Sequence, residues 1–301
     1  MRNIARPLNN LNNLNNLNDL KILAFDTPIR YNGNKYGGKA AAQGGKMKET
    51  LYTIPMTDAF NAHDECPFCY IERNVEQDLL DLVLGSGSSY MESDMREQTD
   101  NAGFCRTHFK KMFDYGNTLG NGWILKTHYQ QINKELEKEI NSFSKGEGGG
   151  GFLKIKKKET GASNSMAAWI QKREKSCYIC NEFNKTYERY IDTFFFMYKK
   201  DGEMERMLQE SKGFCLKHFG DICDAATYKL NDKQQDALFN VLFPLMKENM
   251  ARVGEDVSWL VEKFDYRNKD ADWKNSKDAI QRSMQKLWGG YPADPVYMQN
   301  K

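Results

Sequence analysis

Eight residues of this chain combine the types and the spacing that metal ions need. They form two CxxC pairs and two CxxH pairs: Cys66 and Cys69, Cys105 and His108, Cys177 and Cys180, and Cys215 and His218. Side chains three residues apart in the first turn of a helix can bind the same ion. Three thiolates with one imidazole are the donor set of a closed structural zinc site. The sequence therefore predicts two Cys3His sites and two Zn²⁺ per chain.

These pairs belong to an internal duplication. The phrase "GFCRTHF" at 103–109 returns as "GFCLKHF" at 213–219, with an offset of 110 residues. Each copy follows a CxxC, after 35 intervening residues in the first repeat and 34 in the second. Two complete sets at nearly equal spacing indicate a repeat of two units. We expect each CxxC to share its ion with the CxxH that follows it in the same repeat.

Other uses of the cysteines stay open at this point. A redox role for the "CPFC" dithiol usually requires a strand-to-helix junction in an α/β fold. An iron–sulfur cluster with one histidine ligand is a further alternative, and so is a set of buried thiols without metal. Zinc is favoured over these because both ligand sets are complete.

The stretches around the motifs have the periodicity of helices. Apolar residues recur at a spacing of three to four after each CxxC, from Ile124 to Ile140, and from Leu238 to Phe264, where Pro244 should kink the helix. Shorter helices are expected before Gly116 and in the segment "SKDAIQRSMQKLWGG". Runs of alternating strands are absent from the sequence. The predicted fold class is all-α, with two pseudo-repeated helical units.

Composition divides the chain into five parts. The predicted parts are a leader at 1–46, a helical metal-binding unit at 47–143, a linker rich in Gly and Lys at 144–165, a second unit with a C-terminal extension at 166–290, and a tail at 291–301. The leader repeats Leu-Asn-Asn and has neither helical nor strand periodicity. One hypothesis is that translation starts at Met47, because codons for Gln-Gly-Gly-Lys at 43–46 can contain a ribosome-binding sequence. A genuine disordered tail is the alternative.

Charge and hydropathy exclude some classes of function. The 301 residues carry a net charge of +2, which provides no general attraction for nucleic acid. No stretch approaches the roughly 20 apolar residues of a membrane span, and the N-terminus lacks the pattern of a secretory signal. We therefore expect a cytoplasmic protein, where patterned cysteines more often bind metal than form disulfides. Its partner is unknown from the sequence, and a protein is the candidate class.

The remaining reactive side chains indicate no catalytic site. His63 is expected in an exposed loop, His128 on a packed helix face, and Cys223 as a small apolar residue. No nucleophile-and-base set or phosphate-binding loop occurs, so an enzyme is not the favoured class. The mixed aromatic and polar segment 264–280 is expected to fold back over the helical core, and a binding surface there is the alternative.

The motifs together resemble an uncharacterised protein family of anaerobic Firmicutes, chiefly Clostridia. The resemblance rests on "YTIPMTDAF", "CPFCYIE", "GFCRTHF", "CYIC", "KGFCLKHF" and "FDYRNKDADWKNSKDAI", and it covers about residues 47–290. It implies no catalytic residues. Some relatives are labelled ABC-transporter substrate-binding proteins, which implies export or a lipid anchor. The leading hypothesis is a zinc-stabilised binding or regulatory scaffold, and the alternative is a redox protein that responds to thiol oxidation or to metal.

Overall fold

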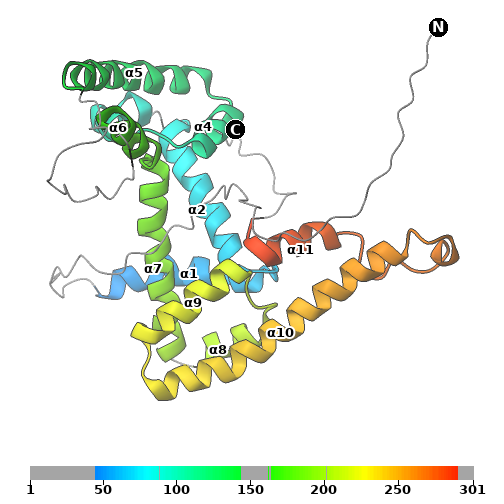
Figure 1. Ribbon diagram of the computed structural model, residues 1–301. Coiled ribbons are helices and arrows are strands. Elements are labelled where there is room, and N and C mark those ends of the chain that lie inside the picture. The colour runs from blue at the N-terminus through cyan, green and yellow to red at the C-terminus, as the bar shows by residue number, and fades with distance from the viewer. Residues whose placement is uncertain (1–44, 88, 144–161, 163, 201, 291–301) are drawn as a thin grey trace, which may run out of the picture. The chain divides into compact units, whose positions relative to one another are not determined.

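Helices account for all the regular secondary structure in the described part of the chain, which confirms the all-α fold class. The computed structural model describes residues 45–87, 89–143, 162, 164–200 and 202–290 (Figure 1). Nearly all of the predicted leader, most of the predicted linker and the whole predicted tail lie outside these residues. The predicted domain boundaries at those segments therefore stay predictions.

The first repeat contains five α-helices and a short 3-10 turn. They are α1 (Gly45–Asn61), α2 (Pro67–Leu84), η1 (Ser89–Met91), α3 (Ser93–Ala102), α4 (Arg106–Tyr115) and α5 (Thr118–Asn141). The second repeat and the C-terminal extension follow the linker. Their elements are α6 (Ser165–Glu174), α7 (Tyr178–Lys200), α8 (Glu203–Glu210), α9 (Leu216–Lys229), α10 (Asp232–Glu262), η2 (Tyr266–Asn268) and α11 (Ala279–Trp288).

The predicted ligands lie at the first turns of four helices. Cys66, Cys105 and Cys215 are the N-cap residues of α2, α4 and α9, and Cys177 directly precedes α7. The second member of each pair lies three residues further on, one turn into the helix. Each pair of side chains therefore points to one side of its helix start, as a shared ion requires.

Two glycines shape the turns before the CxxH helices. Gly103 and Gly213 have φ angles of +65° and +71°, a region that side chains other than glycine rarely adopt. A Cβ atom at position 103 would lie 2.9 Å from the ring of His128, and one at position 213 would lie 2.8 Å from the sulfur of Met246. The repeated glycine therefore serves both backbone conformation and close packing.

The core contains side chains of both repeats. The ring of Phe68 on α2 makes edge contacts with the rings of Phe194 on α7 and Phe214 before α9, at centroid distances of 6.0 and 5.8 Å. Helices α2 and α7 pack side by side and run in opposite directions (Figure 1). The start of α2 lies beside the middle of α7, where Phe68 contacts Tyr187, and the start of α7 lies near the middle of α2.

The C-terminal extension contacts the second repeat through its last helix, whereas most of the segment 264–280, which was expected to cover the core, is exposed. Helix α10 continues through Pro244 and ends at Glu262, before Phe264, which is 82% exposed and so does not line the helix as expected. Helix α11 then packs against α10 and α9. Its Lys286 is buried and donates hydrogen bonds to the carbonyl oxygens of Glu65 and Lys212. These bonds fix α11 to the chain beside the first CxxC and the second CxxH.

Candidate metal centres

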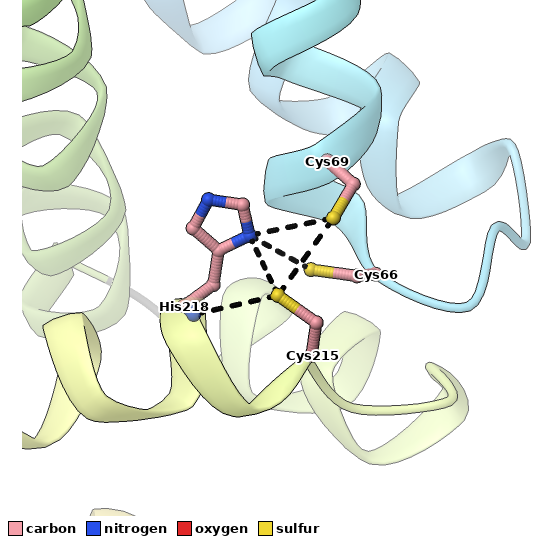
Figure 2. Close-up of side chains that lie close together, drawn as sticks. All are labelled: Cys66, Cys69, Cys215 and His218. Atoms are coloured by element: carbon pink, nitrogen blue, oxygen red, sulfur yellow. Dashed lines mark hydrogen bonds between the residues drawn. The ribbon is translucent and has the colours of Figure 1, made fainter. Parts of the chain in front are cut away.

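The first cluster of ligands, called the inner site, consists of Cys66, Cys69, Cys215 and His218. Figure 2 shows the two cysteines of α2 facing Cys215 and His218 of α9. The Nδ1 atom of His218 lies 3.3, 3.5 and 3.2 Å from the sulfurs of Cys66, Cys69 and Cys215. The Cys69 and Cys215 sulfurs are 3.8 Å apart. All four side chains are buried.

The second cluster, called the outer site, consists of Cys105, His108, Cys177 and Cys180. Here too the Nδ1 atom of the histidine lies among three sulfurs, at 3.2 Å from Cys105, 3.2 Å from Cys177 and 3.3 Å from Cys180. The Cys105 and Cys180 sulfurs are 3.9 Å apart. In contrast to the inner site, Cys105 and Cys180 are partly exposed.

Both clusters have the dimensions of a single tetrahedral ion site. An ion about 2.3 Å from each sulfur and about 2.1 Å from the nitrogen separates two sulfurs by about 3.8 Å and sulfur from nitrogen by about 3.6 Å. The observed sulfur–sulfur distances of 3.8 and 3.9 Å match the first value. The observed nitrogen–sulfur distances of 3.2 to 3.5 Å are slightly shorter than the second. The eight predicted residues therefore form two groups that can each hold one ion.

The grouping crosses between the repeats, and this differs from the expected pairing. The first CxxC meets the second CxxH, and the second CxxC meets the first CxxH. The reason lies in the helix lengths. The 18 residues of α2 carry the chain about 27 Å away from the first CxxC. The first CxxH returns only to the middle of that helix, where His108 lies 3.0 Å from Glu76, and there it meets the second CxxC at the start of α7.

A glutamate of α2 contacts the far nitrogen of each histidine. The Nε2 atom of His218 lies 3.0 Å from Glu72, and that of His108 lies 3.0 Å from Glu76. Such a carboxylate fixes the tautomer with the proton on Nε2 and directs Nδ1 to the metal. Lys217 pairs with Glu72, and Lys111 pairs with Glu76. Neither glutamate was predicted from the sequence, although they follow Cys69 by three and seven residues, a spacing that places them on the same helix face.

The charges of the inner site favour a cation at its centre. Burial raises the pKa of the Cys66 thiol well above its ordinary value. Hydrogen bonds from the Cys66 and Cys69 thiols lower the pKa of Cys215. Burial alone lowers the pKa of His218, but the Glu72 carboxylate and the neighbouring sulfurs raise it well above its usual range. The Cys66 thiol thus stays protonated while the His218 imidazolium faces the Cys215 thiolate, and a divalent ion would replace these protons.

The outer site shows the same division of charge. A hydrogen bond from Cys180 lowers the pKa of Cys177 to about 3, and the same interaction, together with burial, raises the pKa of Cys180. Burial lowers the pKa of His108, but hydrogen bonds to Cys177 and Glu76 raise it to about 10. One thiolate and one imidazolium therefore face each other at this site as well.

The other candidate residues lie outside both groups. His63 is exposed, and its backbone has a positive φ of 51°. His128 is half-buried, and its Nδ1 lies 3.2 Å from the carbonyl oxygen of Asp100, so it packs as predicted. Cys223 is partly exposed and packs against the hydrophobic core. Burial raises the pKa of its thiol, which therefore stays protonated at neutral pH.

The inner site is covered by the C-terminal end of α11, a contact that was not predicted from the sequence. A Cβ atom at Gly289, where α11 ends, would lie 3.5 and 3.6 Å from the sulfurs of Cys215 and Cys69. The buried Lys286 of α11 lies 3.5 Å from the Glu65 carboxylate, next to Cys66. A divalent metal bound by three thiolates and one neutral imidazole would carry a net negative charge, which the nearby Lys286 ammonium group would partly balance.

Among the described residues, no helix combines the length and apolarity that a membrane crossing requires. No curated protein and no solved structure matches the chain. One family model does match, over residues 47–294, and its description is "Family of unknown function (DUF6062)". The matched segment contains all eight ligands of both sites, and it covers most of the chain. The chain therefore belongs to this family of unknown function, DUF6062.

Proposed function

We propose that this protein is a helical scaffold whose two repeats are joined by two zinc ions, one in the inner site and one in the outer site. The observation that carries the proposal is the crossed grouping of the eight ligands. Each ion would bind one pair of ligands from each repeat, and would thereby close a long loop of the chain. A structural zinc of this kind contributes about 10 kcal/mol to folding, which is comparable to the whole stability of a domain.

Zinc agrees best with the donor atoms and their distances. Three sulfurs and one nitrogen at tetrahedral spacing are typical of structural zinc. An iron–sulfur cluster inserts several iron and sulfide atoms between its cysteines, and sulfurs 3.8 Å apart leave room for one ion only. With four protein ligands around each ion, no position is left for a substrate, so we assign the sites a structural role and not a catalytic one.

Because four protein ligands leave no position for a substrate on either ion, we propose a role in binding or regulation. We propose a protein partner, because a net charge of +2 provides no general attraction for nucleic acid. We also propose a cytoplasmic location, where patterned thiols are kept reduced for metal.

A second function, a response to thiol oxidants, is favoured by one observation. Two of the three outer-site cysteines are partly exposed, whereas the inner-site cysteines are buried.

Metal analysis of protein purified without added metal tests the main proposal. We expect about two zinc ions per chain and a folded state that is lost when a strong chelator removes them. Native mass spectrometry gives the stoichiometry, and circular dichroism gives the helix content before and after chelation. A chain that is fully helical and free of metal would contradict the proposal.

A further inference from the structure

The two sites differ in the access of solvent to their sulfurs. All four ligands of the inner site are buried, and the end of α11 lies against two of its sulfurs. In the outer site Cys177 and His108 are buried, but Cys105 and Cys180 are partly exposed. The two exposed cysteines come from different repeats, and their sulfurs are 3.9 Å apart.

We propose that the outer site is an oxidation-sensitive metal site, in which a peroxide converts Cys105 and Cys180 into a disulfide and releases the metal. This inference rests on the proposed metal binding and adds a specific chemistry to one of the two sites. Metal-bound thiolates are both ligands and oxidisable groups. The access of the peroxide to the sulfurs therefore decides which site reacts, and the sulfurs of the outer site are the more accessible ones.

The reaction balances with hydrogen peroxide as the oxidant. In the metal-bound site, the sulfur of one partly exposed thiolate attacks an oxygen atom of the peroxide, the O–O bond breaks, and hydroxide leaves, so that a sulfenic acid forms. The second thiolate attacks the sulfenic sulfur, the S–S bond forms, and the S–O bond breaks with loss of a second hydroxide. Two protons convert the hydroxides to water. Two electrons pass from the sulfurs to the peroxide.

Loss of two ligands removes the metal but keeps the segments joined. Only Cys177 and His108 remain as ligands, and two ligands do not hold zinc in a closed site. The new disulfide would link the start of α4 to the first turn of α7. A backbone hydrogen bond from Tyr178 to the carbonyl oxygen of Gly103, 2.8 Å long, already joins the same two segments. A thiol reductant would reverse the change, because the partners stay close together.

The inner site should not take part in this reaction. Its sulfurs are shielded from solvent by the end of α11 and by the core. The histidine ring of the inner site also contacts the rings of Phe68 and Tyr187, at centroid distances of 5.8 and 5.7 Å. A peroxide therefore reaches this site only after local opening, which makes oxidation slower.

The test combines zinc release with disulfide mapping on the full-length protein. Zinc is first counted in the reduced protein, and hydrogen peroxide is then added in the presence of a colorimetric zinc chelator. We expect release of about half of the bound zinc, and recovery of binding after reduction and addition of zinc. Trypsin should then yield a disulfide-linked pair of peptides, 97–106 with 176–185, because each contains one of the two exposed cysteines.

The outcomes separate the inference from the proposed function. Fewer than two zinc ions before oxidation would contradict the proposed function itself. Two zinc ions that leave together, or that stay until the protein unfolds, would overturn only the inference. So would a disulfide within peptide 176–185, between Cys177 and Cys180. The Cys223→Ser variant is the control, since it removes the one cysteine outside both sites and should release zinc like the unmodified protein.

Discussion

The inner and outer sites have the same donor atoms and differ in what covers them. Both place the Nδ1 of a histidine among three sulfurs, and both support that histidine with a glutamate of α2. The inner site is also covered by α11, an element that follows the second repeat, whereas Cys105 and Cys180 of the outer site remain partly exposed. The repeated sequence motif supplies the same set of candidate ligands twice, and the C-terminal extension covers only one of the two sets.

The difference in burial suits the two sites to different tasks, one to stabilising the fold and the other to reacting with reagents. The buried site is suited to holding the fold together, because water and reagents reach it only when the fold opens. The partly exposed site has sulfurs that reagents can reach in the folded protein. Variants that affect one site and not the other test whether the two sites differ in stability and in thiol reactivity.

The largest effect is expected when an inner-site ligand is removed. Cys215→Ser should lower the free energy of unfolding by a large part of the roughly 10 kcal/mol that a structural zinc contributes. Cys180→Ser in the outer site should cost less, because solvent can reach the remaining ligands there. Chemical denaturation followed by circular dichroism measures both. Equal losses in the two variants would contradict the comparison, and Cys223→Ser is the control with no expected loss.

Closure of the inner site by α11 should depend on Lys286. Lys286→Met removes the hydrogen bonds to the carbonyl oxygens of Glu65 and Lys212 and leaves the buried Glu65 carboxylate without this neighbouring charge. We expect a loss of about 2–4 kcal/mol of stability. The inner-site thiols should also react faster with an alkylating reagent, as mass spectrometry of the peptides can show.

The matched control for this variant is Lys277→Met. Lys277 is exposed and precedes the same helix, so its replacement should leave both stability and thiol reactivity nearly unchanged. If Lys286→Met also leaves the inner-site thiols protected, then α11 does not close that site.

Glu72 and Glu76 should each increase the zinc affinity of the one site whose histidine they contact. Glu72→Gln should weaken zinc binding at the inner site by about 10–100-fold, since it removes the carboxylate that orients His218. Glu76→Gln should do the same at the outer site through His108. Competition with a chelator of known affinity measures both losses. The exposed Glu188 of α7 offers a control, and a Glu188→Gln variant that weakens binding equally would argue against the glutamate contacts.

The smallest effect concerns the glycine turn before the inner site. Gly213→Ala should destabilise the protein by about 1–2 kcal/mol, because the position has a positive φ and a Cβ atom would approach the sulfur of Met246. Gly254→Ala in α10 should instead stabilise by up to about 1 kcal/mol, because that glycine is helical and has open space around it. Thermal unfolding compares the two. A neutral Gly213→Ala would show that the turn tolerates a side chain.

The sequence predicted the local features of both sites. The helices that carry the candidate ligands, the residue types and spacing of these eight candidates, and the glycine turns at Gly103 and Gly213 follow from spacing and periodicity over short distances. The crossed grouping was not predicted, because the motif order along the chain suggests pairing with the nearest partner. The length of the helix after Cys69 already opposed that pairing, since a helix of this length leads the chain away from its start.

The inner site is covered through contacts of α11 that no sequence motif predicts. Lys286 and Gly289 lie more than 70 residues beyond Cys215, in a helix whose pattern indicates only that one of its faces is buried. Which surface that face covers is decided by tertiary packing of α11 against α9 and α10. Local sequence rules do not contain this information.

In the proposed arrangement each metal is bound by ligands from both repeats. One pair of double variants tests this crossed binding most directly. The variant Cys105→Ser with Cys180→Ser should stay helical and retain one zinc ion per chain, because both residues belong to the outer site. The variant Cys69→Ser with Cys105→Ser should lose both zinc ions, because it removes one ligand from the inner site and one from the outer site. If the first variant loses both ions and the second retains one, then each repeat binds its own metal and the crossed arrangement is wrong.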